Sequence, residues 1–322
     1  MATPIFVVGK HRSGTTWLAN QLCEHSQVVG VRHTQHHGLH ESAYFDAIDG
    51  RYGDLRVPAN YIEFVEIVSL SDYFRLAGAT REFLYSLWPT TYADVFQRVM
   101  DRFAGDNSAN YWVEKSPSHS LLVHRLARLY PTARFIAVRR DVEDVAASSI
   151  ALAIRRDPSL AEDASWRRRE LLRTALSWAC YNRILEGFGR RSRRLLWVRY
   201  EDLRADMPAS MERICQFLGL GFEPQVCDPS FAPNSGYSGR NGREGLSRSE
   251  RRLARLIAGI GLAIPWSLLR EALAYARRGH RRPLPKWFFS MLDVPWRRPD
   301  LLPRTITGFE VAAGSPMVQR DG

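Results

Sequence analysis

Short continuous runs of apolar residues alternate along this chain with longer amphipathic stretches. The short runs are rich in β-branched and aromatic residues and lie at 4–8, 111–113, 134–139 and 194–199. Runs of this kind are typical of strands buried on both faces of a parallel sheet. The longer stretches carry apolar residues at helical spacing, and they lie at 92–103, 165–188 and 247–260. The alternation predicts an α/β fold in which helices flank a central parallel sheet.

The first apolar run leads directly into a glycine-containing loop. Residues 4–8 end at Gly9, and a Ser/Thr-rich segment after Gly14 begins a helix with Leu18 and Leu22 on one face. A loop between a strand and a helix N-terminus directs backbone N–H groups and the positive end of the helix dipole toward a bound anion. The order of elements therefore predicts a site for a phosphate-like group, with an ordinary Gly/Ser turn as the alternative.

This loop differs from the phosphate loop of nucleoside triphosphatases at one position. The spacing of Gly9 and Gly14 fits the start of GxxxxGK[ST], but Thr15 stands where the lysine belongs. That lysine reaches the β- and γ-phosphates, so its replacement disfavours ATP or GTP. Positive charge lies inside the loop instead, at Lys10 and Arg12.

The composition favours an anionic partner. The 322 residues carry a formal net charge of +11, and the basic residues lie mainly on predicted helices and in tail segments. No nucleic-acid-reading motif accompanies them, so an anionic nucleotide explains the charge more simply than nucleic acid does. The four cysteines are scattered without CxxC or Cys/His ligand spacing, which predicts reduced thiols and no zinc. Because the first strand leaves no room for a signal peptide or anchor helix, we expect a cytoplasmic protein.

Four segments resemble the signatures of sulfotransferases that use 3′-phosphoadenosine 5′-phosphosulfate (PAPS). They are the phosphosulfate loop at 10–17, Glu-Lys-Ser-Pro at 114–117, the arginine-to-serine segment at 140–148 and Tyr-Glu-Asp at 200–202. The resemblance covers roughly residues 4–250 and is closer to the Golgi-type and bacterial carbohydrate sulfotransferases. It implies a three-layer α/β fold like that of P-loop NTPases, a sulfotransferase activity, PAPS as the sulfonate donor and no metal.

The same resemblance implies a donor site. In the family an arginine at a strand end and a serine eight residues later grip the 3′-phosphate, which points to Arg140 and Ser148, with Arg139 as the register alternative. Ser148 lies about two helical turns after Arg140 and so returns to nearly the same face. Most cytosolic members have lysine in place of Arg12, which keeps the charge but changes its geometry. The donor-binding residues implied are Lys10, Arg12, Ser13, Gly14, Thr15, Thr16, Trp17, Arg140, Ser148, Tyr200 and Arg240, of which Trp17 would face the adenine and Tyr200 touch its edge.

Catalytic residues follow from two of these matches. The segment 38–46 is similar to the acidic stretch of Golgi-type members, where a glutamate deprotonates the acceptor hydroxyl. That match makes Glu41 the general base and His40 its nearest rival. Lys115, at the end of a strand, would stabilise the transition state together with Arg12, and a surface pair between Lys115 and Glu114 is the alternative. His119 is an off-register candidate for the catalytic histidine of cytosolic members. A polar loop explains the histidines between 33 and 40 more simply than a metal site.

The chain beyond residue 250 has a different character. Ser247 and Glu250 predict a capping box at the start of a helix. The apolar stretch 256–269 is too short and broken to span a bilayer, which takes about 20 residues. The mixture of arginines and aromatic residues that follows suits a peripheral membrane contact, with a helical hairpin packed on the domain as the alternative. We therefore expect a sulfotransferase domain at 1–250, a basic, apolar helical extension at 251–302 and a loose C-terminal tail at 303–322.

The predicted reaction moves a sulfonate group in line from PAPS to a hydroxyl of a small-molecule, carbohydrate or glycolipid acceptor. The acceptor itself and the oligomeric state are not predicted. One alternative is a P-loop kinase with a degenerate Walker A loop, which would need an acidic metal ligand at a later strand end, where this chain offers Lys115 and Arg140. The other alternative is a non-catalytic anion-binding module of the same fold.

Overall fold

The computed structural model describes residues 1–33, 38–228 and 245–264. The chain divides into two compact units. The first unit contains residues 1–46 and 101–282, and the second contains residues 47–100 and 283–322. The phosphosulfate-like loop and all other described candidate site residues belong to the first unit.

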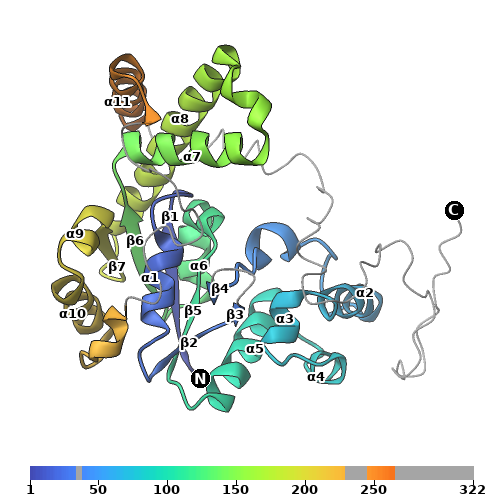
Figure 1. Cartoon of the computed structure of the whole chain (residues 1–322). Helices are drawn as coiled ribbons and strands as arrows, with labels where there is room; N and C mark the ends of the chain where they lie inside the picture. Colours follow the sequence, from blue (N-terminus) through green and yellow to red (C-terminus); the bar gives the residue numbers. More distant parts are fainter. Residues whose placement is uncertain (34–37, 229–244, 265–322) are drawn as a thin grey trace, which may run out of the picture. The chain divides into compact units, whose positions relative to one another are not determined.

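A five-stranded parallel sheet forms the centre of the first unit (Figure 1). Its strands stand in the order β2-β5-β1-β6-β7, with bounds β1 Thr3–Gly9, β2 Val28–Gly30, β5 Tyr111–Glu114, β6 Arg134–Arg139 and β7 Leu195–Arg199. The predicted central parallel sheet is confirmed. Since all strands run the same way, the last residues of β1, β5 and β6 meet at one carboxyl edge, where open α/β sheets bind ligands.

Helices cover both faces of this sheet, because alternate strand residues point to opposite sides. On one face Ile5 and Val7 join a buried cluster with Leu18 and Ile214. The helices on that face are α1 (Thr15–Leu22), α9 (Tyr200–Ala205) and α10 (Met207–Leu218). On the other face Phe6 contacts the rings of Trp112, Phe135 and Tyr130, and Phe135 contacts Phe188. Tyr130 follows α6 (Val123–Leu129), and Phe188 belongs to α8 (Ala164–Gly189).

Three helices of the first unit pack on one another, α7 (Val142–Arg156), α8 and α11 (Arg248–Ala263) (Figure 1). Val145, Ala175, Ala179 and Ala258 share one buried cluster between them. Helix α11 lies close against α8, since a Cβ at Gly261 would be 2.6 Å from the Cβ of Ala179. The predicted capping box of Ser247 and Glu250 at the start of α11 is confirmed.

The remaining elements of the first unit are short. They are the hairpin β3 (Arg32–His33) and β4 (Gly38–Leu39) and the 3₁₀ turns η3 (Pro117–Leu122), η4 (Pro158–Ala161) and η5 (Pro224–Cys227). A π-type turn, η2 (Tyr44–Ile48), follows the hairpin at the end of the first segment of this unit.

The second unit is helical in its described part, 47–100. Its helices are α2 (Pro58–Val68), α3 (Asp72–Leu76), α4 (Arg81–Ser86) and the first part of α5 (Tyr92–Asp106). Tyr61, Phe64, Phe74 and Phe96 are fully buried in it. The amphipathic helix predicted after Pro89 is α5. Among the described residues of the whole chain, no helix is both long and apolar enough to cross a lipid bilayer.

Candidate functional site

The loop between β1 and α1 requires glycine at position 14. Its backbone is in the left-handed region (φ +91°), and an added Cβ would lie 2.4 Å from the Tyr200 ring. Arg12 is also left-handed (φ +74°), and the Ser13 amide donates to the Lys10 carbonyl at 3.0 Å to close the turn. Within the described residues no side chain caps the start of α1. The first amides of that helix are therefore available to an anion.

Arg12, Arg140 and Ser148 converge from three segments of the chain. The Arg12 Nε donates to Ser148 Oγ at 2.9 Å, and Arg140 Nη1 donates to the Arg12 carbonyl at 3.1 Å. Arg140 and Ser148 are buried, at 5% and 8% exposure. The structure thus places two guanidinium groups and a hydroxyl together beside the loop.

Aromatic residues support this cluster. The Arg140 guanidinium lies over the Tyr200 ring, 4.4 Å from its centroid, and Tyr200 meets Trp17 edge to face. The Trp178 indole donates to the Arg140 carbonyl at 2.8 Å. These contacts fix the backbone of Arg140 and the plane of its side chain. The sequence alone does not reveal this role of Trp178, because there it is one apolar position in the amphipathic stretch 165–188.

Three buried polar atoms in this cluster have no hydrogen-bond partner within the described part of the chain. They are Ser13 Oγ, Arg140 Nε and the Tyr200 hydroxyl. An unsatisfied buried donor costs free energy unless a ligand satisfies it. A hydroxyl, a guanidinium N–H and a phenol suit the oxygens of phosphate and sulfate groups, so these residues fit the predicted nucleotide.

Lys10 is the first basic residue of the loop and contacts an aromatic ring of α8. Its ammonium is 5.2 Å from the centroid of the Tyr181 ring. Burial, assisted by the charge of Arg173, lowers the pKa of Lys10 to about 8. Two further loop residues of the predicted donor set, Thr15 and Trp17, are buried, and Thr16 is partly exposed.

Lys115 and Glu41 form an ion pair near the carboxyl edge of the sheet. The Lys115 Nζ donates to Glu41 Oε1 at 2.5 Å. The side chain of Lys115 is 2% exposed and that of Glu41 is 40% exposed, so the carboxylate is the accessible member. Burial favours the uncharged carboxyl, but the Lys115 ammonium outweighs it and lowers the pKa of Glu41 below its ordinary value. The alternative surface pair of Lys115 with Glu114 is wrong, because both residues are buried.

The two histidine candidates are buried. His40 is 2% exposed, and its Nδ1 lies 2.9 Å from the Glu41 carbonyl. His119 is fully buried in η3, and burial lowers its pKa to about 3. Ser120 accepts a hydrogen bond from the Gly9 amide at 2.8 Å and so holds the end of β1. No periodicity or spacing in the sequence marks Ser120.

Two arginine candidates have other positions. The Arg139 guanidinium lies over the Trp178 ring and pairs with Glu186 at 3.1 Å, whereas Ser148 accepts its hydrogen bond from Arg12. Arg240 lies outside the described residues, as do His36, His37 and the chain beyond residue 264. Within the described ranges no group of three or more His, Cys, Asp or Glu residues could hold a metal ion.

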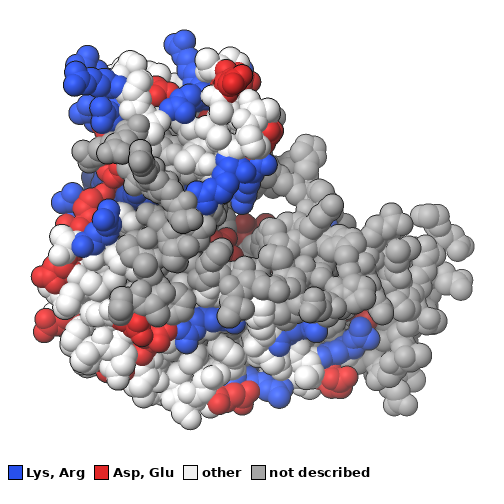
Figure 2. Space-filling view, viewed as in Figure 1, with Lys and Arg blue, Asp and Glu red and all other residues white. Residues whose placement is uncertain are grey.

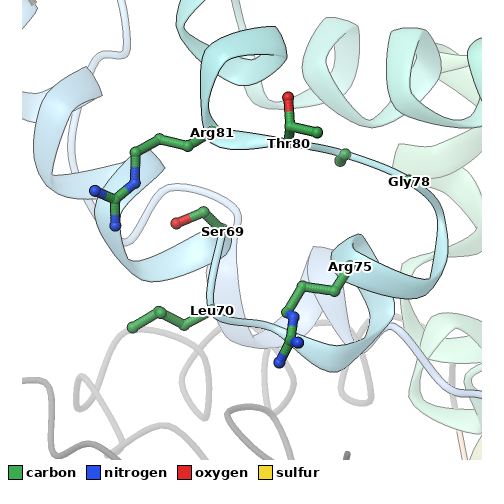
Figure 3. Close-up of a pocket in the computed structure, with 7 residues that line it drawn as sticks. Ser69, Leu70, Arg75, Gly78, Thr80 and Arg81 are labelled. Atoms are coloured by element: carbon green, nitrogen blue, oxygen red, sulfur yellow. The ribbon is translucent and has the colours of Figure 1, made fainter. Parts of the chain in front are cut away.

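A pocket of about 350 Å³ lies in the second unit (Figure 3). Ser69, Leu70, Arg75, Gly78, Ala79, Thr80 and Arg81 line it. None of these residues belongs to the predicted donor or catalytic set, and Arg81 is paired with Glu66 at 3.1 Å. We assign no role to this pocket.

Comparison with known proteins gives one family and one fold. A family model described as the sulfotransferase family matches residues 4–224. The sulfotransferase domain of the Synechococcus PCC 7002 olefin synthase is 20% identical, with a TM-score of 0.50 over 88% of this chain and 96% of that domain. Sulfotransferase STF1 from Mycobacterium tuberculosis H37Rv is 17% identical, with a TM-score of 0.49 over 80% of this chain and 76% of that one. Mouse sulfotransferase SULT7A1, solved in complex with PAP, is 13% identical, with a TM-score of 0.46 over 86% and 89% of the two chains. No curated protein sequence matches this chain.

Proposed function

Because this chain belongs to the sulfotransferase family, we propose that it moves a sulfonate group from PAPS to a hydroxyl of a small-molecule, carbohydrate or glycolipid acceptor, with Glu41 as the general base. The enzyme class and the donor follow from the family. The acceptor class, the base and the individual residue roles are the proposal. The observation that supports this proposal is the ion pair of Glu41 with Lys115. Open α/β sheets bind ligands at the carboxyl ends of their strands, and at this edge the pair brings together a basic group and a cationic donor.

The donor is held at two anion sites that share Arg12. The amides of the loop, Lys10, Ser13 and the first turn of α1 bind the 5′-phosphosulfate. Arg140 and Ser148 bind the 3′-phosphate, and Trp17 and Tyr200 contact the adenine. The hydrogen bonds of Arg12 to Ser148 and Arg140 support this division, because they join the phosphosulfate loop to the 3′-phosphate residues.

In the reaction an acceptor O–H gives its proton to Glu41 while its oxygen forms a bond to the sulfonate sulfur. The bond from sulfur to the bridging oxygen breaks, and adenosine 3′,5′-bisphosphate leaves. Lys10, Arg12, Lys115 and the loop amides stabilise the charge that builds on the bridging and sulfonyl oxygens. When Lys115 turns from Glu41 to a sulfonate oxygen, Glu41 loses the strongest influence that lowers its pKa, so its pKa rises and it becomes a stronger base.

Accessibility favours Glu41 over His40 as the base. The Glu41 side chain is 40% exposed, whereas His40 is 2% exposed and lies against the Glu41 backbone. An acceptor hydroxyl must come within hydrogen-bond reach of the base, which a buried ring does not allow. Neither a kinase nor a non-catalytic binding module needs an accessible carboxylate paired with a buried lysine, so the pair of Glu41 and Lys115 favours the sulfotransferase.

The test is transfer of labelled sulfonate from PAPS to acceptors in a fractionated extract by the wild type and Glu41→Gln. Glu41→Gln should lower turnover by roughly 10²- to 10⁴-fold, the usual contribution of a general base. Its affinity for adenosine 3′,5′-bisphosphate should not change, because Glu41 lies outside the donor cluster. Wild-type turnover in Glu41→Gln would rule out this base, and a wild-type protein that binds the nucleotide without any transfer would favour the binding module.

A further inference from the structure

We propose that Glu114 is a positioning residue that holds the Glu41–Lys115 pair together by joining the two chain segments that carry it. This inference rests on the proposed function, since it gives Glu114 a role only if Glu41 and Lys115 act in transfer. Glu114 is the last residue of β5, and its side chain is fully buried. Nothing in the reaction described above uses it.

One oxygen of Glu114 accepts hydrogen bonds from both segments. Its Oε1 accepts from the Ser42 hydroxyl at 2.8 Å and from the Ser42 amide at 3.3 Å. The same oxygen accepts from the Ser116 hydroxyl at 2.7 Å. Three donors from two segments therefore converge on one buried atom.

The two serines are the chain neighbours of the proposed reacting groups. Ser42 follows Glu41, and Ser116 follows Lys115. A further bond, from the Ala43 amide to Ser116 Oγ at 3.2 Å, links the segments directly. These bonds oppose movement of one segment against the other. The spacing of Glu41 from Lys115 is thus set by the carboxyl group of Glu114.

A carboxyl group suits this position better than an apolar side chain. Without an acceptor here, the buried donors of Ser42 and Ser116 would lose their partner, and a buried donor without a partner destabilises the fold. Ala43 adds a second requirement, because its backbone is left-handed (φ +46°), a conformation that non-glycine residues adopt at a cost. The hydrogen bond from its amide to Ser116 holds that conformation.

The experiment compares Ser116→Ala and Glu114→Gln with the wild type and with Ser210→Ala as a matched control. Ser210 is a buried serine in α10, outside the site. For each protein we would measure turnover, affinity for adenosine 3′,5′-bisphosphate and thermal unfolding. We would also measure the pH dependence of kcat/KM, and return each sample to neutral pH to confirm that the loss of activity is reversible. Ser116→Ala keeps the test valid if Glu114→Gln does not fold.

Ser116→Ala should lower kcat by up to about 100-fold, the loss expected when reacting groups are misplaced by about 1 Å. Glu114→Gln should lower it less, because the glutamine amide keeps one acceptor oxygen for the two serines. Nucleotide affinity should not change. The acidic limb of the pH profile should move to higher pH, because Lys115 now holds Glu41 less closely and no longer depresses its pKa as strongly. The other titratable groups near the pair are His11, Asp46 and His119. Ser116→Ala leaves all three unaltered, whereas Glu114→Gln also removes the carboxylate charge 3.7 Å from His119 Nδ1. Ser210→Ala should keep the wild-type profile.

A purely structural role for Glu114 would lower the unfolding temperature and the active fraction without moving the acidic limb, and that result would overturn the inference. The proposed function would still stand if Glu41→Gln were inactive in the same assay. Wild-type turnover in Glu41→Gln would instead remove the proposed function and this inference with it.

Discussion

At the residue scale, two features restrict position 14 to glycine, namely the left-handed backbone and the nearby Tyr200 ring. A side chain at this position would be strained by the left-handed backbone and would overlap the Tyr200 ring. Tyr200 cannot withdraw easily, since it is buried between Arg140 and Trp17. Gly14 therefore joins the phosphosulfate loop to the aromatic part of the donor cluster.

Gly14→Ala should lower the free energy of unfolding by more than the 1–2 kcal/mol that a left-handed residue costs alone. It should also weaken binding of adenosine 3′,5′-bisphosphate, because the loop and Tyr200 both shift. Gly187→Ala is the matched control. Gly187 lies inside α8 with nothing within 4 Å of an added Cβ, so alanine there should stabilise by about 0.5–1 kcal/mol. Urea unfolding with nucleotide titration gives both quantities, and a Gly14→Ala protein with wild-type stability and affinity would refute this account of the loop.

Single residues also show where sequence-based prediction stops. The sequence marks Lys115 as a strand-end lysine, but its partner Glu41 lies 74 positions away, and no local pattern specifies that pair. Glu114 reads in the sequence as a polar neighbour of Lys115, yet the structure buries it completely. Side-chain partners across segments depend on tertiary packing, which a pattern along one segment does not contain.

At the scale of elements, prediction succeeds where a run is long or strongly periodic. The four apolar runs correspond to β1, β5, β6 and β7, and the helical stretches correspond to α5, α8 and α11. Strand β2 was missed, because its three residues are too few to show a pattern. The Tyr-Glu-Asp segment at 200–202 begins helix α9, which the sequence did not predict. The Glu201 carboxylate accepts a hydrogen bond from the Asp141 amide at 2.9 Å and so joins the start of α9 to the start of α7.

Helix α11 begins the extension predicted at 251–302, and its outward face combines apolar and basic residues. Leu256 and Ile260 are 61% and 53% exposed, one turn apart, and Arg252 is exposed beside them. Arg255 is also exposed, but its guanidinium pairs with Glu143 at 2.6 Å. Leu176 of α8, close to Gly261, is also exposed. We propose that this face contributes a peripheral contact with an anionic lipid surface.

The lipid contact is tested by sedimentation with vesicles. The wild type should bind vesicles that contain phosphatidylglycerol and not vesicles of phosphatidylcholine alone, since each arginine near an anionic surface contributes about 1 kcal/mol. Replacing Leu256 and Ile260 by serine should reduce the bound fraction, whereas Leu129→Ser, a change at another exposed leucine, should not. Equal binding by all three proteins, or none by the wild type, would exclude this face.

At the scale of the whole molecule, charge and fold serve anion binding in different ways. Lysine and arginine side chains gather over α7, α8 and α11 (Figure 2), and a net charge of +11 attracts anions without selecting among them. Selection comes from the fold. The parallel sheet brings the ends of β1 and β6 to one edge, so that Arg12, Arg140 and Ser148 meet although Arg12 and Ser148 lie 136 positions apart.

The central claim is that this chain binds a 3′-phosphorylated adenine nucleotide through the cluster of Arg12, Arg140 and Ser148. Calorimetry with adenosine 3′,5′-bisphosphate and with magnesium ATP tests it most directly, using the wild type, Arg140→Ala and, as a control, Arg139→Ala. The account predicts tight binding of the bisphosphate, a loss of about 1.5–3 kcal/mol in Arg140→Ala for one charged hydrogen-bond donor, and wild-type affinity in Arg139→Ala. Tight binding of magnesium ATP without measurable affinity for the bisphosphate would contradict it.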